Sequence, residues 1–145
     1  MRGTAWKLGM VGLLAAVGAM AQTAERPEPK LSAAETAIVN RQIETLKDPG
    51  EQRMAQGWSN AKKMAEMICR PAALHVLKKQ DADVDKVFLG MDGAESLTLE
   101  SDQRLTGSGE FRTPQGWKDF SFTCEVNAET GKVTNFQHSL VPAHE

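Results

Sequence analysis

The sequence predicts an α+β fold, in which two to three N-terminal helices pack on a four- to five-stranded antiparallel meander sheet. Apolar residues recur at helical spacing from residue 32 to about residue 79, and at the twofold spacing of strands from Val84 onward. Short turn sequences separate the later segments, which favours neighbouring antiparallel strands. Cys69 and Cys124 fall on the apolar faces of a helix and a strand, so we expect one helix-to-sheet disulfide.

The first 21 residues have the pattern of a signal peptide. Arg2 and Lys7 precede an uncharged apolar run, Leu8–Met20, which ends in the small-x-small pattern Ala19-Met20-Ala21. A helix of that length reaches about 20 Å, short of the ~30 Å hydrocarbon core of a bilayer. We therefore expect cleavage after Ala21, or after Ala24, rather than a retained anchor, and a periplasmic or secreted protein.

The charge of the chain indicates which classes of partner it can bind. The formal net charge is −2, and loss of the two basic residues of the signal peptide makes it more negative. Acidic and basic residues are interspersed, which argues against nucleic acid as a partner. Residues 22–31 are polar and contain two prolines, so we expect a disordered or extended lead-in to a single domain at residues 32–141, with a frayed tail at 142–145.

Two helices are expected before the sheet. Ser32 and Glu35 form a capping-box pattern, so the first helix should begin there and run to about Lys47. Asp48 and Pro49 suit the N-cap and first position of the second helix. This second helix should direct one apolar stripe at the core, formed by Met54, Trp58, Ala61, Ala65, Ile68 and Ala72.

Pro71 should break or kink the second helix, with a further turn or two to Lys79. Strands are expected at residues 84–89 and 95–100, joined by a Met91-Asp92-Gly93 turn. Asp102-Gln103 is either a hairpin tip or part of a strand that runs on to Phe111, and both alternatives stay open.

The clearest strand follows the sequence Thr113-Pro114-Gln115-Gly116, which is typical of a type I turn. Asn127–Lys132 then suits a hairpin loop with Gly131 in a left-handed conformation. The last strand, 133–141, should contribute Phe136 and Leu140 to the core. The inward face of the clearest strand should consist of Phe120, Phe122, Cys124 and Val126.

The two cysteines should be paired, because an oxidising compartment makes a disulfide the default. The alternative is two separately buried thiols. Cys69 and Cys124 lie 55 residues apart, and closing a loop of that size stabilises by about 4 kcal/mol on the chain-entropy model.

No catalytic residue, cofactor or metal site is predicted. Asp81–Asp92 imitates a calcium-binding loop, but Lys86 stands where that loop needs glycine. The three histidines lack clustered zinc ligands, and no serine lies in a G-x-S-x-G elbow. Gly107-Ser108-Gly109 is too short to cradle phosphate, and glycine in a strand more often marks close backbone approach.

The candidate partner-binding residues lie in and beside the expected type I turn. Trp117 either packs at the end of the sheet, which we favour, or is an exposed anchor for a partner. The candidates are Thr113, Pro114, Gln115, Gly116 and Trp117.

One spacing pattern resembles a known family, the exported bacterial proteins grouped as "domain of unknown function 930". The resemblance covers about residues 61–140 and includes Cys69 at a helix end. It implies a signal peptide and a helix-plus-sheet fold, and it assigns no activity. The pattern is Gly109-x-Phe111-Arg112, then Trp117-x-x-Phe120-x-Phe122-x-Cys124-x-Val126, then Val133-x-x-Phe136.

We therefore expect a non-enzymatic binding protein whose partner is an unknown protein or envelope component, with no stable membrane anchor after signal cleavage. Two alternatives stay open. Ser108-Gly109-Glu110-Phe111 is similar to the Ser-Gly-x-x-aromatic element of periplasmic lysozyme inhibitors, which are all-β proteins. An envelope hydrolase would need His138 beside an acid and a serine.

Overall fold

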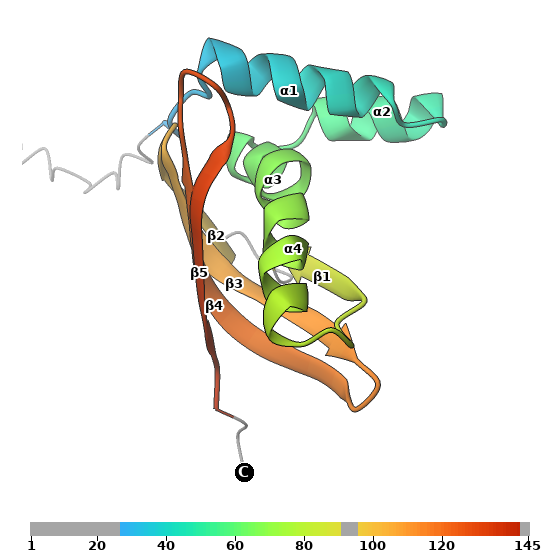
Figure 1. The fold of residues 1–145 in the computed structure, drawn as a ribbon. Helices are drawn as coiled ribbons and strands as arrows, with labels where there is room; N and C mark the ends of the chain where they lie inside the picture. The colour runs from blue at the N-terminus through green and yellow to red at the C-terminus, as the bar shows by residue number, and fades with distance from the viewer. Residues whose placement is uncertain (1–26, 91–95, 143–145) are drawn as a thin grey trace, which may run out of the picture.

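The computed structural model describes residues 27–90 and 96–142, so the expected signal peptide and the expected Met91-Asp92-Gly93 turn lie outside the described residues. It confirms the α+β class, with helices packed on a five-stranded antiparallel sheet (Figure 1). Figure 1 shows α3 and α4 as one column across a face of the sheet, with α1 and α2 beyond one end. The elements are α1 (Ala33–Glu44), α2 (Pro49–Gln56), α3 (Asn60–Met64), the π-helical segment η1 (Ala65–Cys69), α4 (Arg70–Gln80), β1 (Lys86–Leu89), β2 (Leu97–Ser101), β3 (Arg104–Thr113), β4 (Gly116–Val126) and β5 (Val133–Leu140).

β3 is the centre of the sheet, whose order is β1–β3–β4–β5 with β2 also beside β3. β4 pairs with the whole of β3, while β1 and β2 share its other edge, opposite residues 109–112 and 104–107. Ser101 pairs with Arg104, which makes Asp102-Gln103 a hairpin tip and settles the alternative that the sequence left open. β2 to β5 therefore form the expected meander, and β1 extends it along one edge.

α1 begins at the capping box predicted from the sequence. The Ser32 hydroxyl accepts a hydrogen bond from Glu35 N–H (3.1 Å), and Ser32 N–H donates to Glu35 Oε1 (2.9 Å). The same hydroxyl donates to Ala128 O (2.7 Å), in the loop between β4 and β5, so the cap also joins α1 to the sheet. α1 ends at Glu44, earlier than the expected Lys47.

Glu35 is fully buried, and its Oε2 has no hydrogen-bond partner among the described residues. Burial raises the pKa of this carboxyl, hydrogen bonds from Ser32 lower it, and the negative charge of Asp102 raises it, with burial the largest cause. The net effect is a raised pKa at the point where α1 meets the sheet.

The second helix is not continuous, contrary to the prediction. α2 ends at Gln56 with Gly57 as its C-cap, and the Ser59 side chain begins a new helix by accepting a hydrogen bond from Lys62 N–H (3.1 Å). The chain turns at this break, so Met54 is 65% exposed and faces away from the core, while Ala61 beyond it is buried. The predicted apolar stripe is therefore wrong before the break, where helical spacing continued across two helices. It is also wrong at its last member, since Ala72 is only partly buried and Ala73 holds the buried position.

Pro71 does not break the helix. η1 precedes it, and Arg70 N–H donates to Ala65 O, five residues back, in the π-helical pattern. Proline has no N–H for the bond to the carbonyl four residues back, and its ring crowds that carbonyl. The wider π turn accommodates both effects, and α4 continues to Gln80.

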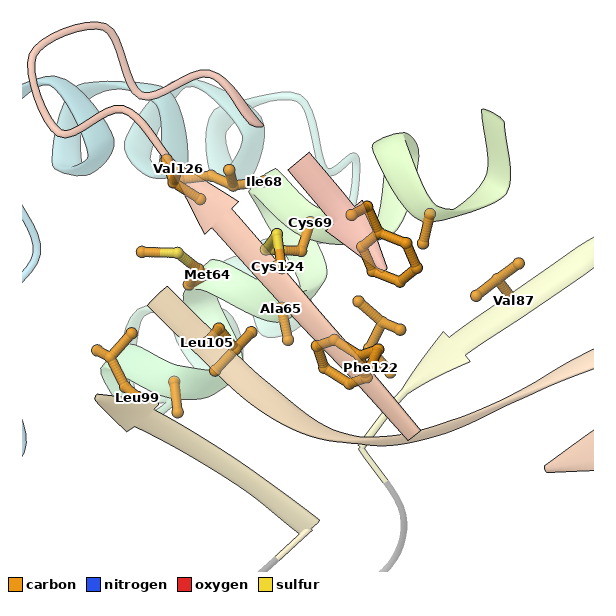
Figure 2. Close-up of a cluster of buried hydrophobic side chains, with 14 of the residues drawn as sticks. Met64, Ala65, Ile68, Cys69, Val87, Leu99, Leu105, Phe122, Cys124 and Val126 are labelled. Carbon is orange, nitrogen blue, oxygen red and sulfur yellow. A yellow bond between two sulfur atoms is a disulfide. The ribbon is translucent and has the colours of Figure 1, made fainter. Parts of the chain in front are cut away.

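The predicted disulfide is confirmed. It joins Cys69 at the end of η1 to Cys124 in β4, with a Cα–Cα distance of 6.3 Å, and both residues are fully buried (Figure 2). Around it, the inward residues of β4 pack against Met64, Ala65 and Ile68, as Figure 2 shows. The prediction for the inward face of β4 is correct for Phe120, Phe122, Cys124 and Val126.

The core of β5 is smaller than expected. Phe136 is buried and stacks on Phe122 with ring centroids 5.6 Å apart, as predicted. Leu140, however, is 56% exposed, so its assignment to the core is wrong. It lies at the end of the outermost strand, where only β4 flanks it among the described strands.

Two glycines have the roles expected of them. At Gly109, a Cβ atom would lie 2.5 Å from Phe88 O and 2.8 Å from Phe120 Cζ, so the neighbouring backbone requires glycine there. Gly131 has φ +72° and donates its N–H to Asn127 O (2.7 Å), which closes the loop between β4 and β5.

The end of the predicted lead-in is held against the domain from Pro27 onward. The Glu28 carboxylate accepts hydrogen bonds from the N–H groups of Asn60 and Ala61, at the start of α3. The Asn60 side chain donates to Pro29 O (3.0 Å), so this segment is extended along the helix start. Among the described helices, none has the length and apolar composition needed to cross a bilayer.

Candidate functional site

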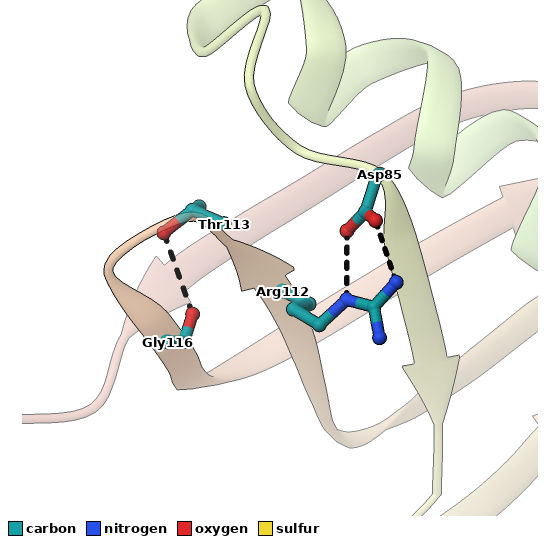
Figure 3. Close-up of polar contacts among 4 residues, drawn as sticks. All are labelled: Asp85, Arg112, Thr113 and Gly116. Atoms are coloured by element: carbon teal, nitrogen blue, oxygen red, sulfur yellow. Dashed lines mark hydrogen bonds and ion pairs between the residues drawn. The ribbon is translucent and has the colours of Figure 1, made fainter.

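The predicted turn is the tight connection between β3 and β4. Thr113 pairs with Gly116, and Gly116 has φ +116°, a conformation that favours glycine. Thr113 is buried, and its hydroxyl accepts from Gln115 N–H (3.2 Å) and lies 3.4 Å from Gly116 O (Figure 3). Thr113 and Gly116 thus fix the turn, and Pro114 and Gln115 form its exposed tip.

Trp117, directly after the turn, is not packed in the core. It is 46% exposed and lies on the outer face of the sheet. Side chains alternate between the faces along a strand, and Trp117 is three residues before the inward-facing Phe120. Its ring stacks on Phe88 of β1 at 5.6 Å between centroids, with an interplanar angle of 25°. Phe88 is itself 38% exposed, so the two rings form an aromatic pair at the surface. The alternative of an exposed aromatic therefore describes Trp117 better than the favoured packing role.

Arg112 completes the group. It lies on β3 between Lys86 of β1 and Trp117 of β4, and its guanidinium carbon is 5.7 Å from the centroid of the Trp117 ring. Its Nε and Nη2 donate to the two oxygens of Asp85, at 3.0 and 2.6 Å (Figure 3). This two-point geometry fixes the plane of the guanidinium group.

The ion pair also sets the charge states. Hydrogen bonding from Arg112 lowers the pKa of Asp85, and hydrogen bonding to Asp85 raises the pKa of Arg112. Both groups are fully charged at neutral pH. We call Phe88, Arg112 and Trp117 the aromatic–arginine patch, with Asp85 as its positioning residue.

Small polar side chains cover much of the remaining outer face. Of the described large apolar residues that are exposed, Phe88 and Trp117 touch each other, whereas Met54 is on α2, and Leu140 and Val141 lie at and just after the end of β5. The patch is thus an aromatic pair with an ion-paired arginine at one end of a polar surface, next to the outward-facing Glu110 and Asp119. Neighbouring outward positions on β3, β4 and β5 hold Thr106, Ser108, Ser121, Thr123, Gln137 and Ser139.

His138 and the segment Ser108–Phe111, which the sequence also singled out, are part of the sheet. His138 lies near Phe120 and Phe136, with ring centroids 6.1 and 6.4 Å away, on the opposite face of β5 from Ser139. The segment Ser108–Phe111 is part of β3. Residues 109–111 are paired on both sides, and Ser108 O accepts a hydrogen bond from Gly90 N–H (2.7 Å). Within the described residues, no three histidine, cysteine or acidic side chains are grouped as a metal site would need.

Sequence reasoning identified Trp117 and the turn but missed Phe88 and the Arg112–Asp85 pair. A signal was present for Phe88: in the segment Lys86–Leu89, burial alternates, so a phenylalanine between Val87 and Leu89 must face outward. The ion pair joins residues 27 apart in sequence and depends on the pairing of β1 with β3.

A protein-family model described as "Domain of Unknown Function (DUF930)" matches residues 59–143. The match begins at the N-cap of α3 and includes both cysteines and the aromatic–arginine patch, while α1 and α2 lie before it. Searches of curated proteins and of solved structures return no match.

Proposed function

The chain belongs to the family of the Domain of Unknown Function (DUF930), and we propose that it is a non-enzymatic binding protein that holds a protein partner at the aromatic–arginine patch. The observation that carries this proposal is the exposed Trp117, stacked on Phe88 beside Arg112. Tryptophan and arginine are enriched among the residues that dominate binding energies at protein interfaces.

The patch is rigid, which favours binding. Trp117 is held by Phe88, and Arg112 is held by two hydrogen bonds to Asp85. Both side chains have therefore lost rotamer freedom before a partner arrives, which lowers the entropic cost of association. β3 is paired on both sides at Arg112, and β4 is paired with β3 at Trp117, so the backbone under the patch is held as well.

We place this function in the periplasm or outside the cell. Two features support that location: the buried Cys69–Cys124 disulfide, which is typical of oxidising compartments, and the signal-peptide pattern at the start of the sequence. The partner is then a protein of the envelope or of the exterior.

The experiment compares Trp117→Ala with Met54→Ala, another exposed apolar residue, on α2. Partners crosslinked to the wild-type protein in cells are identified, and each is purified and titrated against both variants. We expect Trp117→Ala to weaken binding by about thirtyfold, the effect of a central interface residue, and Met54→Ala to leave it unchanged.

Equal binding by all three proteins would refute the role of the patch. Isolated cell-wall glycan is tested in parallel, because aromatic rings also stack on sugars. Retention on glycan that depends on Trp117, with no protein partner, would overturn the proposed partner class. Melting curves of each variant check that loss of binding is not loss of folding.

A further inference from the structure

β5 is an open edge of the sheet. It ends the order β1–β3–β4–β5, so none of the described strands pairs with its outer side. Val141 N–H donates to Asp119 O (3.0 Å), and backbone groups alternate in direction along an antiparallel strand. It follows that the N–H and C=O groups of Phe136, His138 and Leu140 point away from β4.

Apart from a register shift at Thr134, near the start of β5, this edge lacks the usual protection against pairing with another chain. Natural edge strands are commonly short, or carry charged residues or proline. β5 is eight residues long, and its sequence, VTNFQHSL, contains no acidic residue, lysine, arginine or proline. The opposite edge is divided between two shorter strands and carries Lys86 and Glu100.

We propose that β5 pairs antiparallel with β5 of a second copy of this chain, joining the two sheets into one. A twofold arrangement places β5 residues opposite β5 residues, and because the strand has no acidic or basic residue apart from His138, no Lys, Arg, Asp or Glu charges repel across it. If the axis passes near His138, Leu140 lies beside Phe136 of the second copy on the inner face. That contact covers Leu140, which is 56% exposed in the single chain.

The test is the oligomeric state of the purified, oxidised protein, which is measured by sedimentation velocity over a concentration series. Leu140→Pro removes an outward N–H and leaves the bonds to β4 intact, since proline is tolerated where the N–H faces away from the sheet. We expect the wild type to dimerise and Leu140→Pro to raise the dissociation constant by about thirtyfold, equivalent to one backbone hydrogen bond lost from each copy.

Leu140→Ala is the matched control, because it shortens the same side chain and keeps the N–H. It should weaken the dimer less than Leu140→Pro does. A monomeric wild type throughout the series would overturn the proposal, even if an added peptide strand binds β5. Equal dissociation constants for wild type and Leu140→Pro would also overturn it, since another surface would then hold the dimer. Thiol labelling and melting curves confirm that each variant is folded and oxidised.

Discussion

Reducing the Cys69–Cys124 disulfide should destabilise the domain strongly without unfolding it. The bond closes a loop of 55 residues, and the chain-entropy model gives about 4 kcal/mol for that length. Total stabilities of about 0.05–0.15 kcal/mol per residue give about 6–17 kcal/mol for the described domain. Reduction should therefore remove a large part of the stability and still leave a folded majority in most of that range.

The expected loss of stability on reduction can also be expressed as a change in melting temperature. An unfolding entropy of about 2.1 cal/mol/K per residue gives about 0.23 kcal/mol/K for the described domain. A loss of about 4 kcal/mol then lowers the midpoint by about 17 °C. Reduced wild type is a cleaner perturbation than substitution, because both sulfur atoms remain in the core.

The assay is urea and thermal unfolding followed by circular dichroism, with and without reductant, and with thiol labelling to verify the redox state. Cys69→Ala combined with Cys124→Ala is the control, because reductant should not change its stability. The double variant should also be less stable than reduced wild type, since both cysteines are fully buried and their removal leaves cavities. A difference below about 1 kcal/mol between oxidised and reduced wild type would refute the loop-entropy reasoning and indicate a compact denatured state.

Two further predictions concern single side chains. Burial raises the pKa of Glu35, so the free energy of unfolding of the wild type should fall as pH rises from 4.5 through the folded-state pKa. Glu35→Gln keeps the acceptor for Ser32 N–H and should abolish that fall. Urea titrations at several pH values measure it, and the same slope in both proteins would contradict this account. Gly109→Ala should lower the free energy of unfolding by about 1–3 kcal/mol, because the new Cβ would lie 2.5 Å from Phe88 O. Gly57→Ala is the control, because its Cβ meets only ordinary contacts and should leave stability nearly unchanged. Equal melting temperatures for the two variants would count against the close approach.

The local features of the fold could be predicted from the sequence. The capping box at Ser32, the turn at Thr113–Gly116 and the alternation of β4 each depend on residues close together in the chain, and each is confirmed. The break before α3 was missed because apolar spacing continued across it. Gly57 followed by Ser59 was the available signal, since serine is a preferred N-cap.

Long-range pairing could not be predicted. The sharing of one β3 edge by β1 and β2 depends on backbone hydrogen bonds between distant segments, which no local pattern encodes. The aromatic–arginine patch could not be predicted for the same reason. Trp117 was a candidate because it adjoins a turn, but Phe88 and Arg112 lie beside it only because β1 and β4 both pair with β3. Exposure of Leu140 likewise depends on β5 being the last strand.

The π turn before Pro71 also determines which way the long helix faces. Five residues four apart are all buried against the sheet, namely Ala61, Ala65, Cys69, Ala73 and Leu77. On a regular α-helix each step of four overshoots a full turn by roughly 40°, so the last of the five would point roughly 160° away from the first. A π turn needs more residues per revolution and therefore advances by a smaller angle per residue. Because the π turn lies in the middle of the series, it reduces this rotation, so that α3 and α4 both direct buried residues at the sheet and Cys69 faces Cys124.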